Sequence, residues 1–377
     1  MENLYKKVLI VGAGLAGSTI ARILAENSIK VFVIEKRNHV AGNIYDYENE
    51  NNERIHKYGP HLFHCNSKDP ALKFLNRFTK WIEYKHKVRA ILEQDKTTPL
   101  PVNRTTLEDV FNISLSNEKE TINFLNSLRL KIINPNNSDE LFLASYGEKI
   151  TNIFFRPYTE KMWGMKATEL EVSVGARLPF RTDRNENYFN DSFQALPKEG
   201  YHEIFKKMIN HKNISISLNT NFEKSMEKDF FHCFLSIPID QYFNNCFGEL
   251  PYRSIIFENK DINYLQDAPV INFTDKNVYT RSTQWSLFPN SPNKNQNDNY
   301  TITLEKPCSI NKNRGEYYYP VKTKNSRKIY EIYKKKSERL KKITFIGRTG
   351  LFMYIDMAPA VNIHIKIAND FIKENHI

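Results

Sequence analysis

Hydrophobic and polar positions switch between strand and helix spacing near the start of the chain. The stretch KKVLIVGAGLAGSTIARILAENSIKVFVIEKRN, Lys6 to Asn38, opens with a β-branched apolar run, continues with apolar residues at helical spacing, and ends in a second apolar run. This order predicts a strand, a tight glycine turn, a helix and a second strand. We therefore expect a βαβ unit here.

The middle of the chain is patterned mainly as helices. From about residue 70 to residue 163 the apolar residues recur at helical spacing, most strongly in residues 116–132 and 138–163. The strand-like residues 86–102 interrupt this pattern before the two strong segments. We therefore expect a helical part in the first half of the chain.

Later segments return to strand patterns. Residues 201–220 and 230–243 predict a helix and two strands of the kind that return to the first sheet, so the first domain is expected to be discontinuous. Alternating strands of antiparallel type are expected in YRSIIFENK, APVINFTD, TRSTQWSLF and NYTITLEKP, with a mobile hairpin loop at Asn290 to Tyr300.

The turn of the βαβ unit carries a dinucleotide motif. GAGLAG places Gly12, Gly14 and Gly17 in the spacing G-x-G-x-x-G, with Glu35 at the end of the next strand. The first glycine permits the tight turn, the second lets the backbone approach a pyrophosphate, and the third packs helix on strand, while the acid accepts from a ribose hydroxyl. An ordinary glycine-rich turn is the alternative, but the surrounding strand, helix and acid favour FAD or NAD.

Two further segments, one near each end of the chain, favour FAD over NAD. EKRNHVAGN, after the second strand, offers Arg37 as a further phosphate contact and its Gly-Asn pair as a second tight turn. Residues 343–361 predict a strand that ends at Gly347 and Arg348, then a helix whose amino end would face the flavin. The two ends of the chain are expected to close on one cofactor.

Composition narrows the choice of partners. The 377 residues suffice for about two or three packed units, and the net charge is +11, from 54 Lys and Arg against 43 Asp and Glu. Such a charge attracts anions. However, the basic run Lys328 to Lys342 is patterned as a solvated helix face, and no nucleic-acid-binding signature is present, so we expect no nucleic-acid partner.

Cysteine spacing and apolar runs predict the compartment. Cys65, Cys233, Cys246 and Cys308 form no C-x-x-C pair and no zinc spacing with histidine, so we expect reduced thiols and no metal site. No signal-peptide pattern and no apolar run of about 18 residues is present, which predicts a cytoplasmic protein without integral membrane contact. The sequence is compatible with a homodimer.

Short motifs are spread over nearly the whole chain. In chain order they are GAGLAG, VIEKRNHVAGN, IHKYGPHLFH, YTEKMWG, RLPFR with NYFND, PIDQYFNNCFG, YRSIIFE, VINFTD, YTR, YYYPV and GRTGLFMYIDM. In these motifs the chain resembles the UDP-galactopyranose mutases, flavoenzymes that interconvert the pyranose and furanose forms of nucleotide-linked galactose. The resemblance implies that reduced FAD is the active form, that its N5 attacks the anomeric carbon and expels UDP, and that the resulting adduct opens through an iminium and closes on the other hydroxyl.

The resemblance also implies roles for single residues. The expected catalytic residues are Arg177 and Arg281 on the diphosphate and His61 and His64 beside the isoalloxazine. The expected substrate-binding residues are Phe154 and Tyr158 on the uracil, Trp163 near the sugar, Tyr188, Tyr319 and Tyr354 on the phosphates, and Asn272. The expected cofactor-binding residues are Gly12, Gly14, Gly17, Glu35, Lys36, Gly42, Asn43, Arg348 and Asp356. Outside these motifs the aromatic residues would more often be core, and the arginines surface residues.

We therefore expect an α/β fold in which a discontinuous Rossmann-like FAD-binding domain carries an inserted helical-bundle domain and an antiparallel β-sheet domain. The FAD-binding domain is expected at 1–80, 195–248 and 335–377, the helical substrate and lid domain at 104–178, and the sheet domain at 81–103, 179–194 and 249–334. The segment Thr168 to Pro179 is expected to be a lid that carries Arg177 over the diphosphate.

Departures from the family pattern leave the sugar open. Met162, Met353 and Trp285 are apolar replacements, and a more apolar pocket suits a 6-deoxy sugar, because a buried donor left unpaired costs about 1–3 kcal/mol. UDP-galactose is the first expectation, with dTDP-fucopyranose or UDP-N-acetylgalactopyranose as alternatives. A flavin oxidoreductase of the amine-oxidase kind and a non-catalytic nucleotide-sugar binder are the competing classes.

Overall fold

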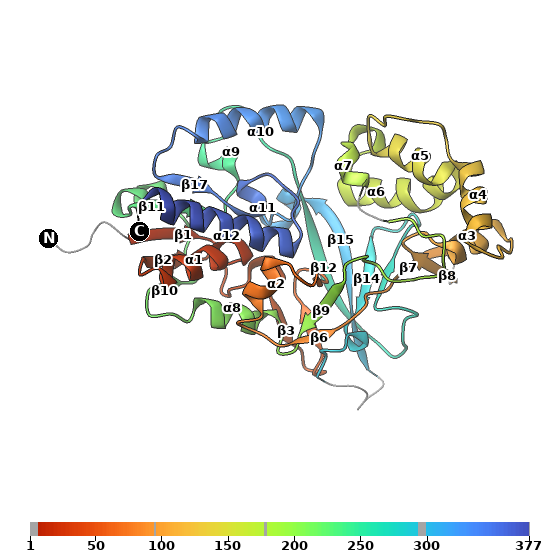
Figure 1. Cartoon of the computed structure of the whole chain (residues 1–377), viewed down its shortest axis with the longest axis horizontal. Coiled ribbons are helices and arrows are strands. Elements are labelled where there is room, and N and C mark those ends of the chain that lie inside the picture. The colour runs from red at the N-terminus through yellow and green to blue at the C-terminus, as the bar shows by residue number, and fades with distance from the viewer. Residues whose placement is uncertain (1–6, 94–95, 177–178, 293–298, 377) are drawn as a thin grey trace.

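The computed structural model describes residues 7–93, 96–176, 179–292 and 299–376. Arg177 and residues 293–298 of the expected hairpin loop lie outside these ranges. Figure 1 shows three neighbouring parts: a parallel sheet with its helices at the left, a long twisted sheet in the centre, and a group of helices at the upper right.

Five parallel strands form the first sheet in the order β10-β2-β1-β11-β17. Their bounds are Lys7–Val11 (β1), Lys30–Ile34 (β2), Ile214–Ser217 (β10), His232–Leu235 (β11) and Ile343–Phe345 (β17). Helix α1 (Leu15–Glu26) makes the crossover that parallel neighbours require between β1 and β2. The βαβ prediction is confirmed, and so is the return of the later strands to the first sheet.

Side chains of β1 alternate between two cores, as the period of a strand requires. Val8 and Ile10 are buried on the face that α1, α8 and α12 cover, whereas Leu9 and Val11 face the core that contains Tyr333 of α10. The covering helices are α8 (Tyr201–Ile209), α9 (Ile239–Tyr242), α10 (Lys324–Ser337) and α12 (Met357–Glu374). The lysines of α10 are exposed, as predicted for the basic run.

Seven strands form the second sheet in the order β16-β12-β15-β14-β13-β7-β8. Their bounds are Val88–Glu93 (β7), Lys96–Leu100 (β8), Tyr252–Ile262 (β12), Val270–Asn272 (β13), Arg281–Gln284 (β14), Tyr300–Ser309 (β15) and Tyr319–Pro320 (β16). Five of the six described neighbour pairs are antiparallel, but β7 runs parallel to β13. The prediction of an antiparallel sheet is wrong for that pair, because a long crossover and not a hairpin connects the two strands.

Helices α3 to α7 follow β8 and form the group at the upper right of Figure 1. They are Arg104–Phe111 (α3), Glu118–Leu128 (α4), Ser138–Ile150 (α5), Arg156–Trp163 (α6) and Val172–Gly175 (α7), with a π-helical turn at Thr151–Phe155 and a 3-10 turn at Ala167–Glu169. The single helix predicted for residues 138–163 is thus interrupted. Pro157 in the first turn of α6 lacks the N–H that would continue a regular helix, which accounts for the change of winding.

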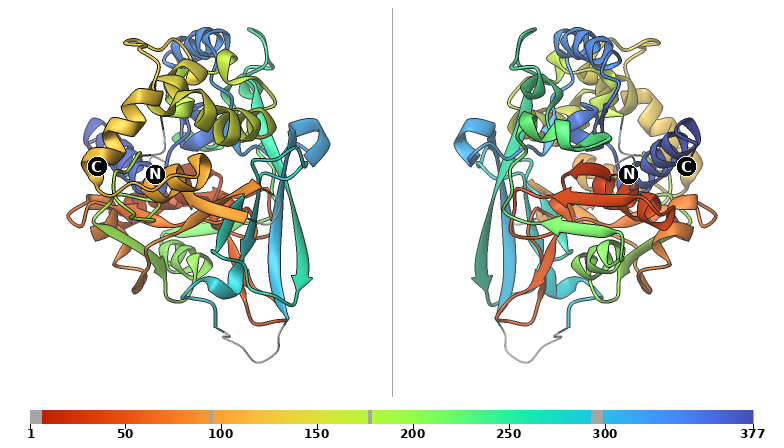
Figure 2. Two further views of the ribbon diagram at one scale, coloured as in Figure 1. Left: turned by 90° about the vertical axis from the view of Figure 1, so that its right-hand side faces the viewer. Right: turned by 90° about the vertical axis from the view of Figure 1, so that its left-hand side faces the viewer.

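Small elements join the two large sheets. They are α2 (Pro70–Leu75), α11 (Gly347–Gly350), the hairpin of β3 (Asp46–Glu48) and β4 (Arg54–His56), and the three-stranded sheet of β5 (Phe63–Cys65), β9 (Phe193–Pro197) and β6 (Trp81–Glu83). The remaining 3-10 turns are Gly42–Ile44, Lys224–Asp229, Trp285–Leu287 and Ile310–Asn313. Figure 2 shows the long strands of the second sheet along one side of the molecule, crossing the direction of the first sheet's strands.

The packing of α1 on β1 depends on a close contact at Gly17. A Cβ atom added to Gly17 would lie 1.9 Å from the carbonyl oxygen of Gly12, far inside van der Waals contact. A Cβ atom added to Gly14 would approach no neighbouring atom more closely than 3.5 Å, which is an ordinary contact. The protein's own packing therefore requires glycine at position 17 and not at position 14.

We expect Gly17→Ala to lower the free energy of unfolding by about 1–3 kcal/mol or more, because helix and strand must move apart. Chemical denaturation of the cofactor-free protein measures this loss. The matched variant Gly14→Ala should change the same quantity by less than about 1 kcal/mol. Equal losses in the two variants would contradict the assignment of Gly17 to packing.

Candidate functional site

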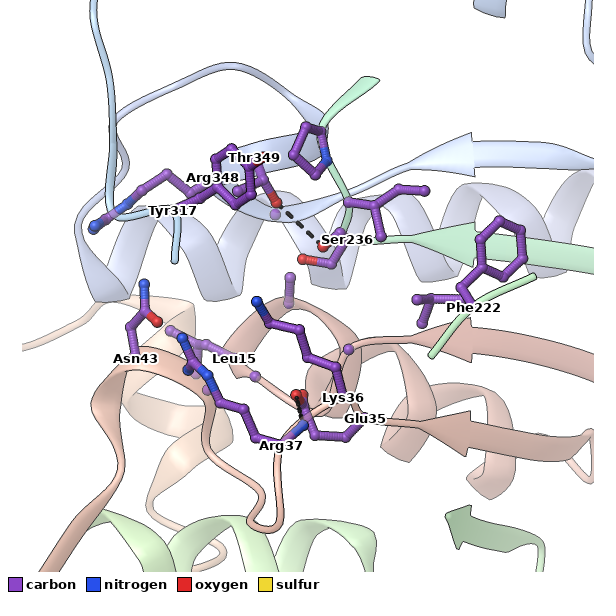
Figure 3. Close-up of a pocket in the computed structure, with 18 of the residues that line it drawn as sticks. Leu15, Glu35, Lys36, Arg37, Asn43, Phe222, Ser236, Tyr317, Arg348 and Thr349 are labelled. Carbon is purple, nitrogen blue, oxygen red and sulfur yellow. Dashed lines mark hydrogen bonds between the residues drawn. The ribbon is translucent and has the colours of Figure 1, made fainter. Parts of the chain in front are cut away.

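A cavity of about 600 Å³ opens at the carboxyl ends of the first sheet's strands. Its walls come from the glycine turn after β1, the end of β2, the loop after β11 and the turn that leads into α12. Figure 3 shows Glu35, Lys36 and Arg37 on one wall and Tyr317, Arg348 and Thr349 on the other. Parallel α/β sheets bind ligands at this edge, and the volume suits a small-molecule ligand.

The amino end of α1 offers backbone donors to this cavity. Gly14 precedes the helix and lines the cavity, and no side chain caps the first turn. Uncapped N–H groups at a helix amino end, together with the helix dipole, bind phosphate. Gly42 packs directly against Gly14, since a Cβ atom at Gly42 would lie 2.9 Å from the Gly14 Cα, and its φ of +53° favours glycine. The second tight turn, at Gly42 and Asn43, therefore borders the same site.

Glu35 is held at the end of β2 by the glycine turn. Its Oε2 accepts a hydrogen bond of 2.8 Å from the backbone N–H of Ala13, and its Oε1 accepts one of 3.0 Å from that of Arg37. The residue is 6% exposed and lines the cavity. Each carboxylate oxygen can accept a further bond, so Glu35 can still receive a ribose hydroxyl.

Lys36 and Arg37 meet a carboxylate from the far end of the chain. Lys36 Nζ lies 3.1 Å from Glu316 Oε1, and Arg37 donates to Glu316 Oε2. The Arg37 guanidinium also lies 4.3 Å from the ring centre of Tyr58. Burial raises the pKa of Glu316, but the two cations outweigh it and lower the pKa below its ordinary value. These groups line one opening of the cavity and could receive a phosphate.

Arg348 links the cavity to a stack of tyrosines. Its Nη1 and Nη2 donate to the carbonyl oxygens of Tyr318 and Ile355, both at 3.1 Å. Its guanidinium lies 4.5 Å from the ring centre of Tyr354 and 5.4 Å from that of Tyr319, and these two rings are stacked with centres 5.5 Å apart. The predicted residues Arg348, Tyr319 and Tyr354 are thus neighbours.

Arg281 is the second cationic centre, on β14. Its Nη2 donates to the hydroxyl of Tyr158 at 2.8 Å, and its Nε lies 3.5 Å from Oε2 of Glu305 on β15. The side chain of Arg281 is 25% exposed, while that of Glu305 is 3% exposed. Burial lowers the pKa of Arg281, but the Glu305 carboxylate and the nearby hydroxyls of Tyr158, Tyr319 and Tyr188 raise it well above its ordinary value. A fixed, partly open cation of this kind is suited to a diphosphate.

Further predicted substrate residues surround Arg281. Asn272 on β13 pairs in register with Arg281, is 7% exposed, and has an amide oxygen without a hydrogen-bond partner among the described residues. Trp163, at the end of α6, lies edge-on to Tyr319 with ring centres 6.1 Å apart. Tyr188 is held by its backbone N–H, which donates to the carbonyl of His86 at 2.8 Å. Tyr158 and Asn272 thus neighbour Arg281, while Trp163 and Tyr354 neighbour Tyr319. Tyr158, Trp163 and Tyr319 pack against one cluster, which contains Met162.

The two predicted histidines lie in different surroundings. His61 lines the cavity, and its Nδ1 lies 2.7 Å from the carbonyl oxygen of Gly59. Burial, with Arg348 and Arg281 nearby, lowers the pKa of His61 to about 4, so its imidazole is neutral at pH 7. His64 bonds Asp191 at 2.8 Å and stacks on Phe189, and it is not one of the described residues that line the cavity.

Three expected residues lie elsewhere or outside the described part. Phe154 is 2% exposed within the hydrophobic core, so its ring is not open to a base in this conformation. Arg177 lies outside the described residues, and the exposed Asp356 immediately precedes α12. Trp285, an apolar replacement considered for the sugar pocket, is fully buried and donates to Thr303 at 2.7 Å. Trp285 is therefore not in the sugar pocket, which corrects that expectation. Its indole N–H is held in the interior by Thr303, a buried residue of β15.

Glu305 and Glu316 were not predicted from the sequence. Glu305 is an acid at the end of the uncharged strand residues 300–304, and that charge is the only signal that could have found it. Glu316 meets Arg37 across 279 residues of sequence, and no local pattern predicts such a contact.

Metal-binding and membrane-spanning features are absent from the part of the chain that the structure describes. That part contains no group of three or more His, Cys, Asp or Glu side chains placed to hold a metal ion. None of its helices has the length and apolar character needed to span a bilayer.

Comparison with known proteins gives consistent matches. The sequence pattern of the UDP-galactopyranose mutases matches residues 153–354, and that of NAD(P)-binding Rossmann-like domains matches residues 10–78. A probable UDP-galactopyranose mutase of Klebsiella pneumoniae is 32% identical, covering 97% of this chain and 95% of that protein. A dTDP-fucopyranose mutase of Escherichia coli is 34% identical, covering 98% and 99%.

Solved structures agree on the fold. A crystal structure of reduced UDP-galactopyranose mutase superimposes with a TM-score of 0.76 at 16% identity, covering 98% of this chain and 94% of that one. A putative protoporphyrinogen oxidase from Exiguobacterium gives a TM-score of 0.66 at 10% identity. At these identities the likeness shows the fold alone.

The lowered pKa of His61 predicts acid sensitivity. An unfolded histidine takes up a proton near pH 6.5, whereas His61 in the folded protein does so near pH 4, so stability falls as the pH drops between these values. From pH 7 to pH 5 we expect His61 to cost about 1–2 kcal/mol of unfolding free energy. Thermal unfolding at both pH values should show a smaller loss in His61→Asn, whereas the exposed His376→Asn should keep the full loss. An unchanged loss in His61→Asn would contradict the assignment.

Proposed function

Because the chain belongs to the UDP-galactopyranose mutase family of isomerases, we propose that it interconverts the pyranose and furanose forms of UDP-galactose with reduced FAD. The class of reaction, pyranose–furanose interconversion of a nucleotide-linked sugar, follows from the family. The observation that best supports the proposal is the partly open Arg281, held between Tyr158 and Glu305. The Tyr319 hydroxyl acts on Arg281 electrostatically, and the Tyr319 ring lies beside Tyr354 and the cavity residue Arg348.

The cavity fits the cofactor that the family implies. The uncapped amino end of α1 supplies N–H donors for a pyrophosphate. Gly14 and Gly42, which lie against each other, carry no side chains that would fill the space in front of these donors. Glu35 can accept a hydrogen bond from a ribose hydroxyl. His61 and Arg348 line the same cavity and would face the flavin end. The residues that we propose for the cofactor are Gly12, Gly14, Gly17, Glu35, Lys36, Gly42, Asn43, Arg348 and Asp356.

The substrate site is proposed beside the flavin end of this cavity. Arg281 would hold the diphosphate, with the hydroxyls of Tyr188, Tyr319 and Tyr354 as further donors and Arg177 as a second arginine. Tyr158 would lie against the base, and Trp163 near the sugar. Asn272 would supply a polar contact. Phe154 would reach a base only after a rearrangement of the core around it.

The chemistry divides between cofactor and chain. Reduced FAD, when bound, would supply the electron-rich nitrogen N5 that displaces the nucleoside diphosphate from the anomeric carbon. Arg281 would stabilise the charge that develops on the departing diphosphate and would keep it bound until it returns. The neutral His61 adds no positive charge next to the flavin at pH 7. The reaction would leave no net redox change.

The apolar replacements bear on which sugar the site accepts. Met162 is 7% exposed and packs in the cluster that includes Tyr158, Trp163 and Tyr319, so this apolar replacement lies beside the proposed substrate site. Met353 is 38% exposed, and Trp285 is buried elsewhere. One relative is named for dTDP-fucopyranose, which keeps that substrate as an alternative. UDP-N-acetylgalactopyranose is the other alternative, on the sequence alone.

We propose that helices α3 to α7 form an inserted substrate domain at 104–178, between the FAD-binding domain (1–80, 195–248, 335–377) and the sheet domain (81–103, 179–194, 249–334). Residues 168–179 would act as its lid. The 3-10 turn Ala167–Glu169 and the one-turn helix α7 show that the described part of this segment is built of short elements.

An assay with three substrates tests the function. The holoprotein, reduced with dithionite, is incubated with UDP-galactofuranose, UDP-N-acetylgalactofuranose and dTDP-fucofuranose, and pyranose formation is followed by chromatography. We expect UDP-galactofuranose to react about tenfold faster or more. Faster turnover of another sugar would reassign the substrate. Inactivity on all three would contradict the mutase proposal. In a parallel assay with NADPH in place of dithionite, consumption of NADPH in step with turnover would also contradict it.

We further expect Arg281→Ala to lower kcat about 100-fold to 1000-fold while FAD remains bound, because the charge on the departing diphosphate loses its stabiliser. Absorbance at the flavin maximum and steady-state kinetics measure the two effects. The exposed Arg327→Ala serves as the control and should keep both. Loss of FAD from Arg281→Ala would show that this arginine belongs to the cofactor site instead.

A further inference from the structure

Lys161 reaches from α6 to the hairpin that joins β13 and β14. Its Nζ donates to the carbonyl oxygen of Phe273 at 2.7 Å and to that of Tyr279 at 2.8 Å, and it lies 3.5 Å from Asp275 Oδ1. The side chain is 15% exposed. An ammonium group has three donors, so these three acceptors use its full capacity. Because all three donors of this largely buried ammonium group have acceptors in the turn, Lys161 fixes the position of α6 relative to the β13–β14 hairpin.

The acceptors of Lys161 flank the residues of the site. Phe273 directly follows Asn272, and Tyr279 stands two positions before Arg281. The hairpin closes between them, where the N–H of Phe273 donates to the carbonyl of Thr280 at 2.8 Å, and Asn272 pairs in register with Arg281. Holding both carbonyls therefore holds the two strands from which Asn272 and Arg281 project.

The same helix also contacts Arg281 directly. Tyr158 and Lys161 are three residues apart on α6 and so lie on neighbouring positions of one helix face. Tyr158 accepts from Arg281 at 2.8 Å, while Lys161 holds the turn beyond it. Helix and hairpin are thus joined at two points, one of them at the cation of the site.

We infer that Lys161 is a positioning residue for nucleotide binding: it locks α6 to the β13–β14 hairpin and thereby sets the distance between Tyr158 and Arg281. The inference rests on the proposed function, because it names the group that keeps the diphosphate clamp in shape. Lys161 acts through Arg281 and does not itself touch the nucleotide.

Removal of the Lys161 side chain leaves another tie on α6. Arg253 on β12 donates to the carbonyl oxygens of Met162 at 3.0 Å and Lys161 at 3.2 Å, and Gly164 ends the helix in the left-handed conformation. These contacts use backbone atoms, which persist when the side chain of residue 161 changes. The substitution Lys161→Met should therefore leave the fold intact and loosen the hairpin alone.

The test measures nucleotide binding by the oxidised FAD-loaded protein, without turnover. UDP and dTDP are titrated separately, and tryptophan fluorescence is followed, since Trp163 ends α6. We expect Lys161→Met to weaken binding about tenfold to a hundredfold, because it removes charge-assisted hydrogen bonds at the hairpin. Lys161→Arg should restore part of the affinity. The control Lys276→Ala, exposed in the same turn, should bind as the wild type does.

A double-mutant cycle separates positioning from general stability. If Lys161 acts through Arg281, Lys161→Met should cause little further loss of affinity in an Arg281→Ala background. Additive losses, unchanged binding in Lys161→Met, or loss of FAD or of the fold in that variant would overturn the inference. Absence of UDP and dTDP binding in the wild type would instead contradict the proposed function itself.

Discussion

The structure depends on a buried carboxylate beneath a partly exposed guanidinium. Glu305 is 3% exposed and faces Arg281, whose other end reaches the hydroxyl of Tyr158. A carboxylate cannot stay charged in the interior without a cation, and burial accordingly raises the pKa of Glu305 while Arg281 opposes the rise. The pair holds Arg281 in place on β14, where its Nη2 reaches the hydroxyl of Tyr158 on α6.

A second constraint joins the two ends of the chain. The glycine turn after β1 and the turn before α12 form opposite walls of one cavity, and Arg348 extends from that cavity to the rings of Tyr319 and Tyr354. Trp163 lies next to Tyr319, and Tyr158 of the same helix contacts Arg281. A cofactor in the cavity and a diphosphate at Arg281 would therefore share one wall, which is the arrangement that transfer of a sugar between them requires.

The sequence predicted those parts of the site whose signals are local. The glycine spacing, the acid at the end of β2 and the strand and helix periods of Lys6 to Asn38 lie within one βαβ unit, and the structure contains that unit. Family motifs predicted Arg281 and Tyr158 for one site, and the structure hydrogen-bonds these two side chains. Non-local facts were not predictable: the parallel pairing of β7 with β13, the burial of Phe154 and Trp285, and the acids Glu305 and Glu316 all depend on contacts between distant segments. Pro157 was a signal for the π-helical turn before α6, but the apolar periodicity of residues 138–163 predicted one continuous helix instead.

The central claim is that the diphosphate leaves the sugar and returns within a single site. Positional isotope exchange tests it most directly: UDP-galactose labelled with ¹⁸O at the oxygen between the sugar and the β-phosphorus is incubated with the holoprotein, and ³¹P NMR follows the label. We predict that ¹⁸O moves to the non-bridging β-phosphate positions when FAD is reduced and stays in place when FAD is oxidised. Interconversion of pyranose and furanose without any movement of the label would contradict the account.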